Sequence, residues 1–251
     1  MSEPGNRTPQ DGDAPDLLPF ADDLHSPVGS PAAGAGAEAD EGLEPEDSTA
    51  AMYARARQCS DAGETREAIA IYRALLAREP RHVRARNNLA LLLEKSGDVD
   101  AALAELGKAL GFDADNVSVL CNRAAILTAR LKYDLAETDL TRAARIDERN
   151  TEVLTNLGIL LCKRARWREA IAPLEQAAHL EPGRASARYY LGEAYNHIDQ
   201  LSAALASYEA AAALQPTNWR AFKGVGMVLD RMGRPAEATL AYQRSREIQR
   251  R

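Results

Sequence analysis

Three asparagines recur at a constant interval of 34 residues: Asn88 in NNLALLL, Asn122 in CNRAAIL and Asn156 in TNLGILL. An amide side chain both donates and accepts hydrogen bonds, so a row of amides could pair with the N–H and C=O groups of an extended peptide whatever its side chains. The alternative is that each amide bonds a neighbouring helix or only water. The spacing therefore predicts a peptide contact and leaves that alternative open.

Residues with catalytic or metal-binding chemistry do not gather in the sequence. The three cysteines, Cys59, Cys121 and Cys162, have no metal-ligand or disulfide spacing, and the four histidines are equally scattered. There is also no glycine-rich phosphate loop and no nucleophile elbow. We therefore expect no catalytic residue, cofactor or metal, and we interpret Cys121 and Cys162 as small apolar filling residues.

The elements that would position the asparagines are given by an internal repeat that runs from Thr49 to Arg251 without insertion or deletion. Each copy has room for two helices of about 13 residues and a short turn. A single hairpin cannot bury its apolar face, so the copies must stack. The predicted repeats are 49–82, 83–116, 117–150, 151–184, 185–218 and 219–251.

Small and bulky residues return in phase in every copy, as close helix packing requires. The first small site comprises Ala56, Ala90, Ala124, Gly158, Gly192 and Gly226. The second comprises Ala68, Ala102, Ala136, Ala170, Ala204 and Ala238, each followed four residues later by leucine or tyrosine. The sequence thus predicts an all-α fold, an α-solenoid of twelve antiparallel helices with no strand.

This pattern closely resembles that of the tetratricopeptide repeat family, which shares the 34-residue period, the order of small and bulky residues and the closing proline. The resemblance covers residues 49–251 and implies a right-handed superhelix. Four arginines depart from the family pattern by replacing apolar residues: Arg55, Arg86, Arg123 and Arg188.

The resemblance also implies that the first helix of each hairpin lines a concave groove. The candidate groove residues are Asn88, Asn122, Asn156, Arg57, Arg84, Asn87, Lys95, Lys163, Tyr189, Asn196 and Lys223. For most of the charged ones, a solvated helix face is the simpler interpretation.

Residues 1–48 differ in composition from the repeats. They carry a net charge of −11, against +5 for the remaining 203 residues, and they contain seven of the twelve prolines. We expect this arm to be disordered. It contains one apolar segment, DLLPFADDL at residues 16–24, which could reach the chain's own groove, although a plain solvating tail is the simpler interpretation.

These observations favour a non-catalytic adaptor that binds an extended peptide segment of a client protein. The alternative is a structural subunit of a larger assembly that uses its convex or end surfaces. The charge is too evenly spread to favour nucleic-acid binding. Because there is no long apolar run and no signal segment, we expect no membrane insertion and a cytoplasmic location.

Overall fold

The computed structural model describes residues 48–250, and these residues form twelve α-helices, labelled α2 to α13, with no strand among them. The predicted disordered arm therefore lies outside the described residues, except for Ser48. The first helices of the hairpins are α2 (Thr49–Asp61), α4 (Val83–Lys95), α6 (Val117–Ala129), α8 (Thr151–Lys163), α10 (Ala185–His197) and α12 (Trp219–Arg231).

The second helices are one or two residues longer than the first. They are α3 (Thr65–Arg78), α5 (Val99–Phe112), α7 (Tyr133–Ile146), α9 (Trp167–Leu180), α11 (Leu201–Leu214) and α13 (Pro235–Gln249). Each first helix begins at the residue where a copy of the repeat is predicted to begin, which fits six repeats. Ser48 caps α2, because its side chain accepts a hydrogen bond from the Ala51 amide.

The small sites bring the two helices of a hairpin into close contact, as the sequence pattern predicts. All six alanines of the second site are at most 1% exposed. At Gly158, an added Cβ atom would lie 2.3 Å from Cγ of Leu174, and at Gly192 it would lie 2.7 Å from the ring of Tyr208. Glycine is therefore required there by the closeness of the neighbouring side chain.

The four arginines that replace apolar residues all find acceptors. Arg86 donates to the Pro80 carbonyl at 2.9 and 2.6 Å and also pairs with Glu105. Arg123 donates both Nε and Nη2 to the buried carboxylate of Asp139, at 2.7 and 2.6 Å. Their long side chains thus pack within the repeat while the guanidinium groups stay bonded.

The remaining two arginines bond in the same manner. Arg55 pairs with Glu67 at 2.9 Å, and Arg188 donates to the Ala178 carbonyl at 3.3 Å. The departures from the family pattern are therefore compensated locally, and the packing of the hairpins is retained.

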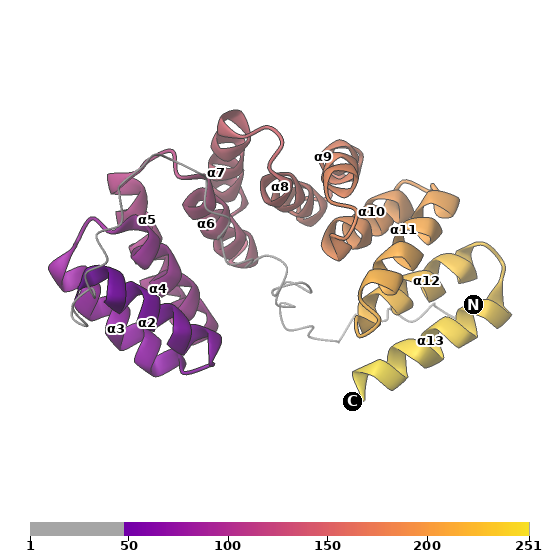
Figure 1. Cartoon of the computed structure of the whole chain (residues 1–251). Coiled ribbons are helices and arrows are strands. Elements are labelled where there is room, and N and C mark those ends of the chain that lie inside the picture. The colour runs from indigo at the N-terminus through magenta and orange to yellow at the C-terminus, as the bar shows by residue number, and fades with distance from the viewer. Residues whose placement is uncertain (1–47, 251) are drawn as a thin grey trace, which may run out of the picture.

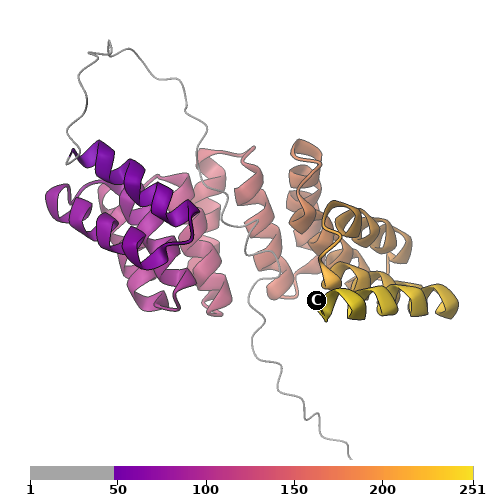
Figure 2. The same cartoon turned by 60° about the horizontal axis from the view of Figure 1, so that its bottom comes forward.

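The hairpins stack into an arch in which α6, α8 and α10 lie on the inner side and α7 and α9 on the outer side (Figure 1). Consecutive first helices contact one another, as in the pairs α6–α8 and α8–α10, whereas consecutive second helices are not closely packed. Helices α2 and α13 lie at opposite ends of the stack (Figure 2). The predicted fold class, an α-solenoid, is confirmed.

None of the helices between residues 48 and 250 combines the length and the apolar character needed to cross a membrane.

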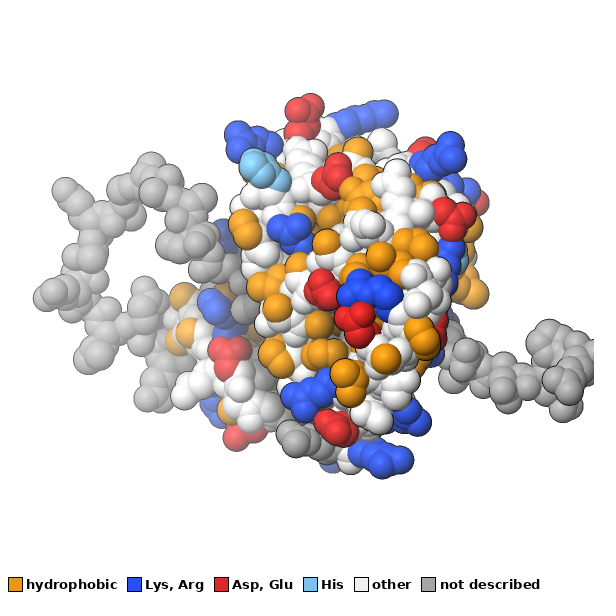
Figure 3. Space-filling model, turned by 90° about the vertical axis from the view of Figure 1, so that its right-hand side faces the viewer, with side chains coloured by type: hydrophobic (Ala, Val, Ile, Leu, Met, Phe, Trp, Pro, Cys, Tyr) orange, Lys and Arg blue, Asp and Glu red, His pale blue; other side chains and the backbone are white. Residues whose placement is uncertain are grey.

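The C-terminal end of the stack has a mixed surface. Seen from the side of α13, hydrophobic side chains are interspersed with positive and negative ones (Figure 3). Ser245 is buried and donates to the Trp219 carbonyl at 2.9 Å, while Leu240 on the same helix is 65% exposed. Helix α13 is thus fixed to α12 on one side and faces solvent on the other.

Candidate peptide-binding surface

The asparagine ladder (Asn88, Asn122 and Asn156) links adjacent inner helices. The side-chain nitrogen of Asn88 on α4 donates to the hydroxyls of Tyr53 and Tyr72, each at 3.1 Å. Burial raises the pKa of Tyr72 to about 12, although the bond from Asn88 lowers it. Asn88 is half-buried, and its carbonyl oxygen makes no hydrogen bond within residues 48–250. That oxygen remains able to accept from a ligand.

The next member of the ladder is more enclosed. Asn122 on α6 is 5% exposed, and its nitrogen donates to Oδ1 of Asn87 on α4 at 2.8 Å. Asn88 and Asn122 therefore both reach back 35 residues, to the preceding inner helix. The side-chain N–H groups of Asn88 and Asn122 thus bond neighbouring helices, which is the alternative to a contact with a peptide.

Asn156 on α8 follows the same register, but the residue 35 positions before it is Cys121. Asn156 is 4% exposed, and both of its amide atoms are buried without a partner in the described part of the chain. A thiol is a poor substitute for the hydroxyl or amide found at the equivalent places. The ladder is thus interrupted at its third member.

The other candidate groove residues fall into two groups. Five cations lie exposed along the inner helices: Arg57, Arg84, Lys95, Lys163 and Lys223. By contrast, Tyr189 and Asn196 on α10 are buried, at 8% and 6% exposure. The structure brings Tyr189, Asn196 and Lys223 together in one place, a pocket between α10 and α12.

This pocket, which we call the α10–α12 pocket, has a volume of about 190 Å³. It is lined by Tyr189, Glu193, Asn196, His197, Tyr208, Trp219, Arg220, Lys223, Gly224 and Met227. Gly224 occupies the position that asparagine holds in the ladder, and a Cβ atom there would lie 2.6 Å from the Tyr208 ring. The absence of a side chain at Gly224 therefore lets the buried Tyr208 ring pack directly against the α12 backbone.

One carboxylate lines the α10–α12 pocket. Glu193 accepts a hydrogen bond from the Tyr189 hydroxyl at 2.9 Å. Burial raises the pKa of Glu193, although the Tyr189 bond and the cations Lys163 and Arg220 lower it. Glu193 is thus half-buried in the pocket, whereas Lys223 stays exposed at its rim.

The α10 side of the pocket is held rigidly by its neighbours. The ring of His197 stacks on Trp167, with centroids 3.8 Å apart and planes 4° from parallel. Burial and the nearby Arg231 lower the pKa of His197, so this ring is neutral at pH 7. Arg231 also donates to the Asn196 carbonyl at 2.6 Å and to its side-chain oxygen. Asn196 therefore positions α12 against α10.

A second carboxylate with a shifted pKa lies on α8. Burial raises the pKa of Glu152 to about 7; Arg184 lowers it and Glu181 raises it further. Glu152 is partly buried, and its charge also contributes to the raised pKa of Cys121. The middle of the inner face therefore changes its charge near neutral pH.

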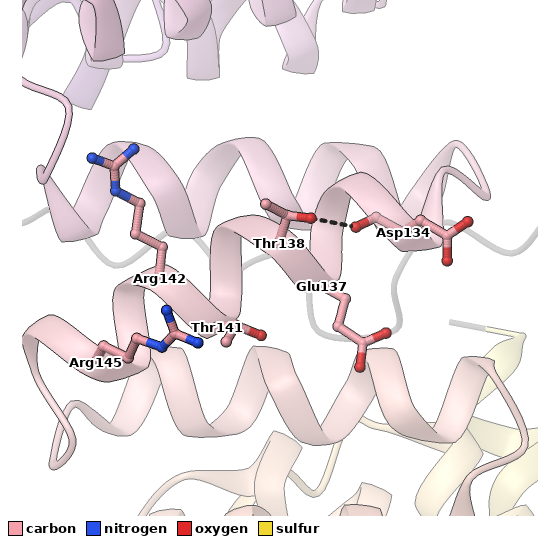
Figure 4. A pocket seen from close by; sticks show the side chains of 6 residues that line it. All are labelled: Asp134, Glu137, Thr138, Thr141, Arg142 and Arg145. Atoms are coloured by element: carbon pink, nitrogen blue, oxygen red, sulfur yellow. Dashed lines mark hydrogen bonds between the residues drawn. The ribbon is translucent and has the colours of Figure 1, made fainter.

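A larger hollow of about 590 Å³ lies on the outer helix α7 and is lined by Asp134, Glu137, Thr138, Thr141, Arg142 and Arg145 (Figure 4). Several of its polar groups bond within the protein. Thr138 donates to the Asp134 carbonyl at 2.9 Å, and Arg164 pairs with Asp134 and Glu137 at 3.0 and 2.5 Å. This hollow is open and has no apolar anchor.

The cysteines are buried. Burial raises the pKa of Cys121 and of Cys162, so both thiols stay protonated, as expected of apolar filling residues. Cys59 lies near Glu64 and Glu67, the one grouping of possible metal ligands in residues 48–250. Burial and both carboxylates raise the pKa of Cys59, and Glu67 is paired with Arg55. A protonated thiol is a poor metal ligand.

Sequence reasoning missed the α10–α12 pocket as a unit. It identified Tyr189, Asn196 and Lys223 but not the aromatic wall formed by Tyr208 and Trp219. The available signal was Gly224, a glycine at the ladder position one repeat away from an aromatic residue. A residue without a side chain at this position indicates that a neighbouring ring packs closely against the helix.

Paired antiparallel helices repeated in one direction define the class of helical-repeat solenoids. The tetratricopeptide repeat model matches residues 53–117, 155–218 and 198–250, so the chain belongs to the tetratricopeptide repeat family. Membership in this family indicates a protein–protein interaction module. No curated protein matches the chain.

Several solved structures share the fold. PilF of Pseudomonas aeruginosa is 20% identical with a TM-score of 0.69, covering 78% of this chain and 95% of PilF. A tetratricopeptide repeat protein from Parabacteroides merdae is 18% identical with a TM-score of 0.63, covering 77% of both chains. YrrB, described as having an unusual peptide-binding site, is 21% identical with a TM-score of 0.56, covering 71% of this chain and 92% of YrrB. At these identities the likeness concerns the fold.

Proposed function

We propose that this protein is a non-catalytic adaptor whose inner face binds an extended peptide segment of a client protein. The observation that carries the proposal is the α10–α12 pocket on the inner helices. Sites for whole small molecules commonly span about 300–1,000 Å³. A pocket of about 190 Å³ instead suits a single side chain of a larger ligand.

The rest of the inner face supports a ligand that continues beyond the pocket. Exposed cations occur on α2, α4, α8 and α12, so a long ligand would meet them in turn. Asn88 adds an amide carbonyl that can accept from a peptide N–H. The more enclosed amides of Asn122 and Asn156 contribute less unless the inner helices separate.

A photo-crosslinking residue placed at Met227 tests the proposal. Met227 lines the pocket and is 41% exposed, so the substitution is tolerable and the probe faces a bound ligand. In lysate of the native host we expect a crosslinked client, whose attachment point maps by mass spectrometry to an extended segment. The matched control is the same probe at Leu135 on the outer helix α7, which is 57% exposed.

A second candidate function, a structural subunit that uses its outer surface, is favoured by one observation. Leu131, in the turn before α7, and Leu135, in the first turn of α7, expose 66% and 57% of their surface. Neighbouring exposed leucines favour a protein contact. Crosslinks that form only from Leu135 and never from Met227 would contradict the adaptor and support this second candidate.

A further inference from the structure

The apolar part of the α10–α12 pocket fits an aromatic side chain. The rings of Tyr189 and Tyr208 lie edge to face with centroids 5.6 Å apart. Gly224 lies directly against the Tyr208 ring, and Trp219 and the 41% exposed Met227 add apolar surface that a ligand can reach. Aromatic rings pair well in such offset and edge-to-face arrangements. A ring entering the pocket would therefore contact rings and a thioether.

The charged part of the pocket fits a ligand with acidic residues beside that ring. Lys223 and Arg220 on α12 lie at the rim, 5.9 and 4.8 Å from the centroid of the Trp219 ring. The opposing carboxylate is Glu193, which is hydrogen-bonded to the Tyr189 hydroxyl. Lys223 is the exposed cation of the rim, and acidic neighbours of the ligand's ring would be attracted to it.

A segment with this chemistry is present in the chain itself. Phe20 is the one aromatic residue among residues 1–47. It lies within DLLPFADDL, residues 16–24, with Asp22 and Asp23 two and three residues beyond it and Asp16 four residues before it. The residue before Pro19 is biased toward an extended backbone, which suits a groove ligand.

The intervening chain is long enough. Residues 25–47 number 23 and can span at most about 75 Å when extended, at about 3.3 Å per residue. Helix α2, which follows Ser48, is five inner helices away from α12. At about 10 Å between packed helices this separation is about 50 Å. The segment can therefore reach the pocket of its own molecule.

We propose that residues 16–24 occupy the α10–α12 pocket of the same chain, with Phe20 against Met227 and the Trp219 ring and the aspartates near Lys223. This inference rests on the proposed function, since it takes the inner face to be a peptide site. A client would then compete with the chain's own segment. At an effective concentration of about 1 mM, a segment with an intrinsic Kd of about 100 μM weakens client binding about ten-fold.

Fluorine NMR of the full-length chain with 5-fluorotryptophan tests this proposal. The protein has two tryptophans, Trp167 and Trp219, and Trp219 lines the pocket. We expect Phe20→Ala to shift the Trp219 signal, and a synthetic peptide of residues 14–27, added to this variant, to restore it. The matched control is Leu43→Ala, an apolar residue of the same arm outside the segment, which should leave the signal unchanged.

Three outcomes would overturn the proposal. An identical Trp219 signal in the wild type and in Phe20→Ala, with no response to the peptide, would show that the segment does not use the pocket. A Trp219 signal that changes when the wild type is diluted would show that the pocket binds residues 16–24 of a second copy of the chain. Equal affinities of the wild type and of Phe20→Ala for the 14–27 peptide would exclude competition between the peptide and the chain's own segment. In each case, a client crosslinked at Met227 would leave the proposed function standing.

Discussion

At Gly158, helices α8 and α9 approach so closely that the residue has no room for a methyl group. Cγ of Leu174 would lie 2.3 Å from an added Cβ atom, and this atom is too near the backbone to move away easily. The equivalent residues in the first three repeats are alanines that are fully buried. The requirement for glycine is therefore set by the local distance between helices.

We expect Gly158→Ala to lower the free energy of unfolding by about 1–3 kcal/mol, because the core around Leu174 would be overpacked. Thermal melting followed by circular dichroism measures this loss. The control is Gly183→Ala, since nothing lies within 4 Å of a Cβ atom at that position. Equal melting temperatures for the two variants would contradict the close approach.

Glu152 makes stability depend on pH near neutrality. Its carboxyl pKa is raised to about 7, mainly by burial, so the folded state favours the protonated form. The stability that this form contributes is complete below the unfolded pKa of about 4.5 and is lost as pH rises through about 7. The charged form is the less stable one in the folded protein.

We therefore expect Glu152→Gln to stabilise the protein at pH 8 and to have little effect at pH 4. A pKa raised from 4.5 to about 7 corresponds to at most about 3 kcal/mol. Denaturant titrations of both proteins at the two pH values measure the difference. A gain of the same size at pH 4 and pH 8 would assign the effect to packing rather than to ionisation.

At the scale of elements, the turns within the hairpins differ between the middle and the ends of the stack. In the first, second and last repeats a glycine takes the left-handed conformation, as at Gly97 with a φ of 86°. In the three middle repeats the equivalent residues are Leu131, Ala165 and Asp199, with φ of 58°, 57° and 63°. Such residues strain the backbone in this region.

We expect Ala165→Gly to raise the free energy of unfolding by about 0.5–1 kcal/mol. The left-handed conformation costs a residue with a Cβ atom about 1–2 kcal/mol, and the greater entropy of unfolded glycine offsets part of the gain. The reverse change, Gly97→Ala, should destabilise the protein by a similar amount. Chemical denaturation of the two variants measures both, and effects of the same sign would contradict the explanation.

The helices could be predicted from the sequence because their packing depends on residue size at fixed intervals. The alanines of the second small site, such as Ala136 and Ala170, indicate close contact whatever the neighbouring loops do. The pairing of Asn122 with Asn87 could not be predicted, because it depends on the distance between two separate inner helices. The α10–α12 pocket depends in the same way on the Tyr208 ring beside Gly224.

At the scale of the whole molecule, stability should decrease toward the ends of the stack. Helix α13 packs closely against α12 alone, and α2 against α3 alone, whereas α8 packs against helices on both sides. Solenoid stability is a sum over repeats and their interfaces, so terminal helices open more easily. Hydrogen exchange should therefore be faster in α2 and α13 than in α8. Uniform protection along residues 48–250 would show all-or-none unfolding instead.

The packing of the solenoid is one-sided, and this has a mechanical consequence. Consecutive inner helices touch one another, while consecutive outer helices are not closely packed. If the arch bends, we expect the touching inner helices to keep their spacing and the outer helices, which pack against inner helices rather than against one another, to absorb most of the change. The length of the arch, measured along its inner face, therefore stays nearly constant. A ligand lying there experiences a constant spacing while the molecule flexes, whereas a ligand spanning the outer helices would be stretched and released.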